Sequence, residues 1–143
     1  MKPGRDPSQR WGMGAFADSI AGRDRVADAG VTESERLYAL FTHLSLLVVH
    51  ITGIPVVPAL ILWLIRKDRS AFIDDHGREA VNFQISLTIY TLAIIPLALL
   101  SCGVAAVLYI PVYILAIYGM IVASIAAHKG QFYRYPMCVR LLR

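Results

Sequence analysis

Three polar residues at the start of a long apolar tract are the first candidates for chemistry in this chain. Glu79, Asn82 and Ser86 follow one another at helical spacing, so they share one face of a helix that enters the tract. Because polar groups in lipid must find hydrogen-bond partners, we expect this face to contact other helices and to fix their register. The alternative is a functional one, in which the face lines a polar cavity or pathway.

Two histidines of the preceding apolar tract form a second candidate. His43 and His50 stand two helical turns apart and therefore share a helix face. Ionisable residues inside a membrane are candidates for a proton relay or a metal pair. A neutral histidine is much cheaper to bury than a carboxylate, however, and can simply bridge two helices. We therefore assign both histidines to the helix-contact face.

A third candidate is a metal site at the charged boundary before the second tract. Asp75 and Glu79 share a helix face, because residues four apart are neighbours on a helix. His76 lies one residue off that face, and such ligands would suit only a weakly held divalent ion. The competing interpretation is a solvated helix start in which Asp74 pairs with Arg78. We favour this interpretation and predict no metal and no cofactor.

Motifs for catalysis are missing from the sequence. It contains no His-Glu-x-x-His helix, no Gly-x-Ser-x-Gly elbow and no phosphate-binding loop. An intramembrane aspartyl site is also excluded, because neither apolar tract contains an aspartate. We therefore expect no catalytic residues and no enzyme activity.

The elements that carry these residues follow from the distribution of charge. Of 143 residues, 57% are hydrophobic and 17% are charged, whereas soluble domains have about 45–50% apolar and about 25% charged residues. Every Asp, Glu, Lys and Arg falls in 1–36, 66–79 or 129–143, which leaves 37–65 and 80–128 uncharged. Uncharged runs well beyond about 18 residues predict membrane spans. The sequence therefore predicts an all-α integral membrane protein.

The first tract is too long for one straight span and contains helix breakers. As a single helix, 37–65 would be about 43 Å long, and the hydrocarbon core of a bilayer is about 30 Å thick. Gly53, Pro55 and Pro58 would break or kink it. Only a hairpin returns the basic cluster that follows to the side of the basic N-terminus. We predict a short helical hairpin broken between Gly53 and Pro58, with spans of about 37–53 and 55–65, the second tilted or re-entrant.

The second tract must cross twice. As one helix it would be about 73 Å long, and Ser101, Cys102 and Gly103 provide a turn in its middle. The resulting spans are about 81–100 and 104–127.

Capping signals mark the start of order and of the third span. Thr32 and Glu35 form a capping box, which predicts that the first helix begins directly after Thr32. Ser70 can cap a helix over 71–80, which we interpret as an interfacial helix that leads directly into the third span. Residues 1–31 are rich in Gly and Pro and contain no apolar run of signal-peptide length. We predict that they form a flexible, disordered cytoplasmic tail.

Four crossings place all Lys and Arg residues on one side of the membrane and two uncharged turns on the other. This agreement with the positive-inside rule predicts a four-helix transmembrane domain over 32–143, with both termini cytoplasmic. Cys102 and Cys138 then lie on opposite sides and should not pair. Basic and aromatic residues that flank the spans are expected at the membrane interface: Trp63, Arg66, Lys67, Arg69, Arg78, Tyr133 and Arg134.

Net charge gives little reason to expect nucleic acid as a partner. The charge of +4 is spread over three segments, and the chain has neither a basic face with aromatic residues nor a nucleic-acid-binding motif. We expect the lipid bilayer as partner, together with other membrane-protein subunits or further copies of the chain.

Several motifs follow one another in the order of a known family. They are Glu35-Arg36 before His43-Leu44-Ser45, Gly53 with Pro58 and Trp63 before Arg66-Lys67-Asp68, the run His76-Gly77-Arg78-Glu79-Ala80-Val81-Asn82-Phe83-Gln84-Ile85-Ser86, and Gly130 with Tyr133-Arg134-Tyr135-Pro136. Over about 33–143 the chain resembles the Tic-twenty-like bacterial family of small membrane proteins, distantly related to the four-helix subunit of the chloroplast inner-envelope import machinery. The resemblance implies a compact four-helix membrane domain in a bacterial cytoplasmic (inner) membrane, and it says little about activity.

The sequence therefore predicts a non-enzymatic membrane protein that is a scaffold or an accessory subunit of a larger membrane complex. The alternative is a transport or protein-translocation component, which the resemblance to the import subunit favours. The helix broken between Gly53 and Pro58 would then belong to the pathway. The polar face distinguishes the two functions: dry helix contacts favour the scaffold, and a water-filled cavity favours transport.

Overall fold

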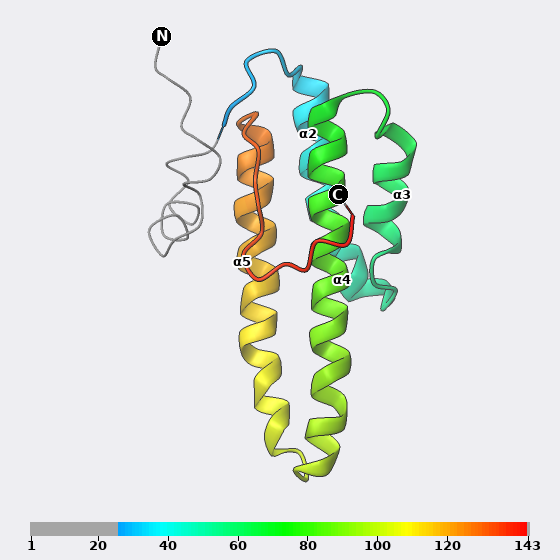
Figure 1. Cartoon of the computed structure of the whole chain (residues 1–143), viewed down its shortest axis with the longest axis vertical. Helices are drawn as coiled ribbons and strands as arrows, with labels where there is room; N and C mark the ends of the chain where they lie inside the picture. Colours follow the sequence, from blue (N-terminus) through cyan, green and yellow to red (C-terminus); the bar gives the residue numbers. More distant parts are fainter. Residues whose placement is uncertain (1–25, 143) are drawn as a thin grey trace.

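The computed structural model describes residues 26–142, and for His50 it describes the backbone alone. This part of the chain is helical almost throughout, as Figure 1 shows. Its elements are α2 (Glu33–Thr52), α3 (Val57–Arg66), α4 (Ala71–Leu100), the 3₁₀ helix η2 (Val104–Leu108) and α5 (Tyr109–His128). The predicted all-α class with four helices is confirmed. Residues 1–25, most of the predicted tail, lie outside the described residues.

The helices begin and end where local chemistry stops them. Thr32 and Glu35 form the predicted capping box at the start of α2, and the Ser70 hydroxyl accepts the Phe72 N–H at 3.2 Å at the start of α4. Gly53 ends α2 in the left-handed region, with φ of 70°, a conformation that glycine adopts without steric cost.

Helices α2 and α3 form the predicted hairpin. The chain descends along α2, turns after Gly53, and returns along α3 to the start of α4 (Figure 1). The Tyr38 hydroxyl donates to the carbonyl of Leu62 at 2.5 Å and ties the two helices together. The 10 residues of α3 make a helix of only about 15 Å. The hairpin therefore ends well before the far end of α4.

Helices α4 and α5 form a second, much longer hairpin. The 30-residue α4 is continuous, so the helix predicted over 71–80 does lead directly into the helix predicted over 81–100. After Ser101, Gly103 turns the chain with φ of 93° and α5 runs back beside α4 (Figure 1). Among the described residues, two stretches, Ala71–Leu100 and Val104–His128, are long and apolar enough to cross a membrane by length and composition.

The last part of the chain, which we call the C-terminal segment (131–142), runs back along α5 and then crosses α4 (Figure 1). Its Tyr133 and Tyr135 are buried in the main core between α2, α4 and α5. Near its start, Gln131 forms an antiparallel β-bridge with Ala27, and the Phe132 N–H donates to the carbonyl of Val26 at 2.9 Å.

The bridge changes one expected boundary, because residues 26–31 were assigned to the flexible tail. They are instead held against the C-terminal segment, and Val31 is buried. The contacts at the bridge are backbone hydrogen bonds, which leave no side-chain pattern in the sequence.

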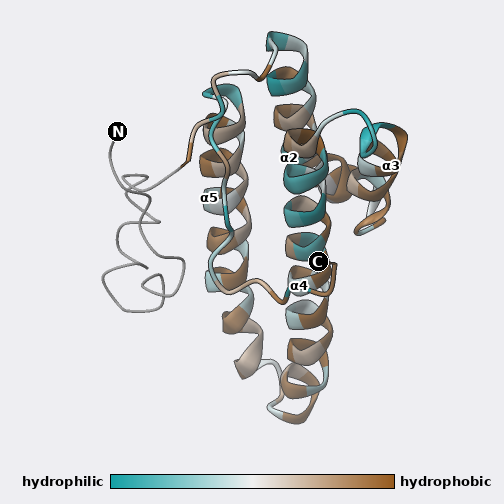
Figure 2. Ribbon diagram, turned by 45° about the horizontal axis from the view of Figure 1, so that its top comes forward, coloured by the Kyte–Doolittle hydropathy of each residue, from teal (hydrophilic) through white to brown (hydrophobic). Residues whose placement is uncertain are grey.

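Hydrophilic and hydrophobic residues occupy different ends of the molecule. Figure 2 shows hydrophilic residues at the end where α2 and α4 begin and along the first half of α4, whereas the far ends of α4 and α5 are hydrophobic. The core polar residues therefore lie in the half of the molecule that also contains α2, α3 and the C-terminal segment.

Candidate functional site

The predicted polar face of α4 exists, and its partner is the C-terminal segment. Glu79, Asn82 and Ser86 are all buried. The Ser86 hydroxyl accepts the Val139 N–H at 2.8 Å, and a Glu79 carboxylate oxygen accepts the Tyr135 N–H at 3.2 Å. The prediction that this face contacts other helices is corrected, because the face contacts the C-terminal segment. An extended segment leaves backbone N–H groups unpaired, and these side chains accept their hydrogen bonds.

Asn82 makes three hydrogen bonds with this segment. Its Oδ1 accepts the N–H groups of Leu141 at 3.1 Å and Leu142 at 2.9 Å. Its Nδ2 donates to the carbonyl of Leu142, also at 2.9 Å. The side chain therefore satisfies the backbone at the end of the described chain.

Arginines of the C-terminal segment neutralise the buried carboxylate. The Glu79 side chain is 5% exposed, and Arg140 Nε donates to it at 3.0 Å, while Arg134 lies 3.5 Å away. Arg134 also binds both oxygens of Asp75, at 2.7 and 2.5 Å. Although burial opposes its charge, the hydrogen bonds and charge of Asp75 raise the pKa of Arg134 above its ordinary value. A buried carboxylate without such partners would be strongly destabilising.

Tyr135, whose N–H binds Glu79, also begins a chain of hydrogen bonds that crosses the core. The Tyr135 hydroxyl lies 2.9 Å from His43 Nδ1, His43 Nε2 lies 2.8 Å from His76 Nδ1, and His76 Nε2 lies 3.1 Å from the carbonyl oxygen of Gln131. The chain joins α2, α4 and the C-terminal segment at one point.

The direction of this chain follows from its two ends. The Gln131 carbonyl can only accept, so His76 donates from Nε2 and, when neutral, accepts at Nδ1. His43 then donates from Nε2 and accepts the Tyr135 proton at Nδ1. Burial raises the pKa of Tyr135 well above its ordinary value, which keeps this donor protonated. Two neutral rings therefore satisfy every ring nitrogen.

Of the two predicted histidines, only His43 can be placed in a helix contact. His43 bonds to His76 on another helix, and the side chain of His50 lies outside the described part of the structure. The metal candidate is also not assembled, because Asp75 and Glu79 bind arginines. Within residues 26–142, no group of three or more His, Cys, Asp or Glu that would suit a metal is found.

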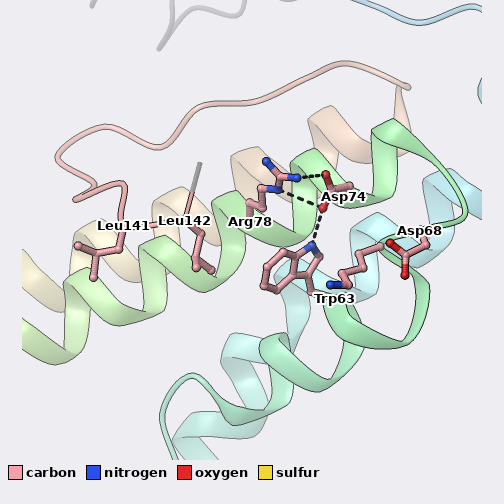
Figure 3. Close-up of a pocket in the computed structure, with 7 residues that line it drawn as sticks. Trp63, Asp68, Asp74, Arg78, Leu141 and Leu142 are labelled. Atoms are coloured by element: carbon pink, nitrogen blue, oxygen red, sulfur yellow. Dashed lines mark hydrogen bonds and ion pairs between the residues drawn. The ribbon is translucent and has the colours of Figure 1, made fainter.

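A polar pocket lies where the end of α3 meets the start of α4 (Figure 3). It has a volume of about 350 Å³, and Leu141 and Leu142 close one side. The Trp63 indole N–H donates to Asp74 at 2.8 Å, and Arg78 binds the same carboxylate. The expected pair of Asp74 and Arg78 is therefore present.

The other residues expected at the membrane interface have different surroundings. Arg66 lies over the ring of Tyr38, 4.5 Å from its centroid, and Lys67 lies 5.7 Å from that of Trp63. Arg69 is exposed. Tyr133 is buried in the core.

Sequence reasoning missed Tyr135 and Arg140, both of which bind the polar face or the histidine chain. A signal for the segment was present, because Tyr133 and Tyr135 alternate with the half-exposed Arg134. Alternation of this kind is typical of an extended segment with one buried face.

Comparison with protein families matches residues 34–142 to the magnetosome magnetite crystal formation protein family, MamF/MmsF. No curated protein and no solved structure matches the chain. The resemblance to the Tic-twenty-like family is therefore wrong, and nothing supports a relation to the chloroplast import subunit. Glu79, Asn82 and Ser86, in the motif that suggested it, bind this chain's own C-terminal segment. Because the match covers most of its length, the chain belongs to the magnetosome magnetite crystal formation protein family.

Proposed function

We propose that this protein is a non-enzymatic scaffold or accessory subunit of a membrane complex that takes part in magnetite crystal formation. The family supports the process, and the two long apolar helices support a place in the membrane. We place it in a bacterial inner membrane with both termini in the cytoplasm, in keeping with the positive-inside rule.

One observation carries the choice of a scaffold. Glu79, Asn82 and Ser86 each bind the C-terminal segment and are buried. Groups that line a pathway must face water or a solute, whereas these groups hold two parts of one chain together. The resemblance that favoured translocation no longer stands, so we propose no second function.

The outer face of α5 is the surface best suited to a partner. Its small residues point inward, since Ala116, Ala123 and Ala127 are buried, and a Cβ on Gly119 would lie 3.0 Å from Phe83. The outward stripe is large and apolar, and it consists of Ile110, Ile114, Tyr118, Ile121 and Ile125. Beside it, an apolar groove of about 620 Å³ lies between α4 and α5.

The partner is tested by purification from the source bacterium. The tagged chain is extracted directly into native nanodiscs, and its partners are quantified by mass spectrometry and native gels. We expect other membrane proteins at a fixed ratio, and we expect Ile114→Ala with Tyr118→Ala to reduce that ratio. A matched pair on α3, Ile61→Ala with Leu64→Ala, should leave it unchanged. Recovery of the chain alone, or only with copies of itself, would contradict the accessory role.

The process is tested by deletion of the gene in the same bacterium. We expect the size or number of magnetite crystals in electron micrographs to change, and the wild-type gene to restore them. Crystals identical to those of the parent strain would contradict a role in their formation.

A further inference from the structure

The two ends of the molecule differ in width. At the charged end, α2, α3, α4, α5 and the C-terminal segment lie side by side, whereas the other end consists of α4, η2 and α5 (Figure 1). A contact fixes the depth of the short hairpin, because Gln84 Nε2 donates to Ser45 Oγ at 3.2 Å. From this contact α2 continues for about 10 Å to Thr52, whereas α4 continues for about 24 Å to Leu100.

Charge places the hydrocarbon core of the bilayer along α4. No charged residue follows Glu79 in α4, and its partner Arg140 is 39% exposed and must remain near headgroups. From Asn82 to Leu100, α4 is about 27 Å long, close to the core thickness of about 30 Å. The core therefore begins near Asn82.

The short hairpin then reaches only the near leaflet. Thr52 lies about 10 Å beyond the level of Gln84 and therefore about 13 Å beyond that of Asn82, just under half of the core thickness of about 30 Å. The tip is apolar and open to acyl chains, with Ile51 86% and Ile54 53% exposed. In the C-terminal segment, Met137 and Leu141 are also exposed apolar residues on this half of the molecule.

We propose that the chain is a wedge that prefers curved membranes, with the leaflet on its charged side convex. The near leaflet must accommodate two helical hairpins and the C-terminal segment, and the far leaflet only the longer hairpin. Curvature that spreads the near leaflet relieves this difference in area, and segments that bury apolar surface in one leaflet only bind membranes in a curvature-sensitive way. The ligand of this activity is the bilayer itself, so the proposal is independent of any protein partner.

The depth of the hairpin is measured first. Fluorophores are placed at Ile51→Cys and Leu99→Cys, with Cys102→Ser and Cys138→Ser in both, in vesicles of phosphatidylethanolamine and phosphatidylglycerol. We expect the Ile51→Cys label to be quenched best by lipids with a nitroxide near the acyl terminus. The label at Leu99→Cys should respond to an aqueous quencher on the far side. An equal response of the Ile51→Cys label to that quencher would show a full crossing and overturn the wedge.

Curvature preference is measured in tubes drawn from giant vesicles of the same lipids. For molecules whose charged end faces outward, the ratio of protein to lipid fluorescence should exceed that of the parent vesicle and rise as the tube narrows. Ile51→Asn with Ile54→Asn should lower this enrichment, and the control Leu92→Ala with Ile95→Ala should preserve it. Equal partitioning of the wild type, or enrichment that the hairpin variant retains, would overturn the proposal.

Discussion

The side-chain amide of Asn82 pairs with the backbone of Leu142 through both of its polar atoms. Nδ2 donates to the Leu142 carbonyl, and Oδ1 accepts the Leu142 N–H, each at 2.9 Å. One side chain of α4 thus pairs with an extended segment much as a neighbouring strand would. Glu79 and Ser86 bind the same segment on either side of it.

Asn82→Leu should destabilise the fold without preventing membrane insertion. The substitution removes three part-buried hydrogen bonds to Leu141 and Leu142, each of which contributes about 0.5–1.5 kcal/mol. Thermal unfolding in mild detergent should show a lower midpoint, and carboxypeptidase should trim the C-terminus faster. The control is Thr88→Val, because Thr88 bonds only within α4, to the carbonyl of Gln84. Equal stability of Asn82→Leu and wild type would contradict a structural role for the amide.

Tyr135→Phe should destabilise the protein more than its size change suggests. It removes the hydroxyl that donates to His43 at 2.9 Å and leaves a buried ring nitrogen unsatisfied, which costs about 1–3 kcal/mol. The ring itself is retained and still stacks on Phe83, with centroids 3.8 Å apart. Denaturant titration against Tyr118→Phe, at an exposed site on α5, measures the difference. A loss no larger than that of the control would show that the histidine chain does not need this donor.

Much of the fold could be predicted because its signals are local. Thr32 with Glu35 and Gly53 before Pro55 act within a few residues, and each does so in the structure as expected. The uncharged length of 80–128 likewise required a turn, and Gly103 provides it.

The candidate site could be predicted only in part, because its partners are distant in the sequence. The types of Glu79, Asn82 and Ser86 indicated buried hydrogen bonds, but their partners are largely backbone groups some 60 residues away that have no signature of their own. His43 was compared with His50 on the same helix, whereas packing brings it to His76 on another. Short motifs around the same residues also suggested the wrong family. Residues that are needed only for packing can recur in unrelated families, so a few short motifs are less specific than a match over 34–142.

Gly77→Ala should separate α3 from α4. A Cβ at this position would lie 2.2 Å from Trp63 Cδ1, and such overpacking costs about 1–3 kcal/mol. Alanine is the better helix former by about 1 kcal/mol, so the clash should dominate and the unfolding midpoint should fall. In the double variant with Trp63→Leu the obstacle is removed, and alanine should then be neutral or stabilising relative to glycine. If Gly77→Ala is already neutral beside Trp63, the close packing of the two helices is incorrect.

Cys138 should be alkylated more slowly at neutral pH than the exposed Cys102. Burial raises the pKa of the Cys138 thiol, and because the thiolate is the reactive form, a thiol whose pKa exceeds the ordinary value of about 8.5 is less reactive at pH 8. Cys102 is exposed in the turn after α4. Iodoacetamide rates between about pH 7 and 10 in the single-cysteine variants Cys102→Ser and Cys138→Ser measure the difference, which unfolding in detergent should abolish. Equal rates in the folded variants would contradict the buried position of the C-terminal segment.

The central claim, that the polar face of α4 binds the chain's own C-terminal segment, is tested most directly by hydrogen–deuterium exchange in nanodiscs. The amides of Tyr135, Val139 and Leu142 donate to Glu79, Ser86 and Asn82. We predict that these amides exchange as slowly as those of the middle of α4, and that Asn82→Leu accelerates Leu142 most. Exchange at the rate of an unstructured peptide in the wild-type protein would contradict the claim and reopen a water-filled polar face.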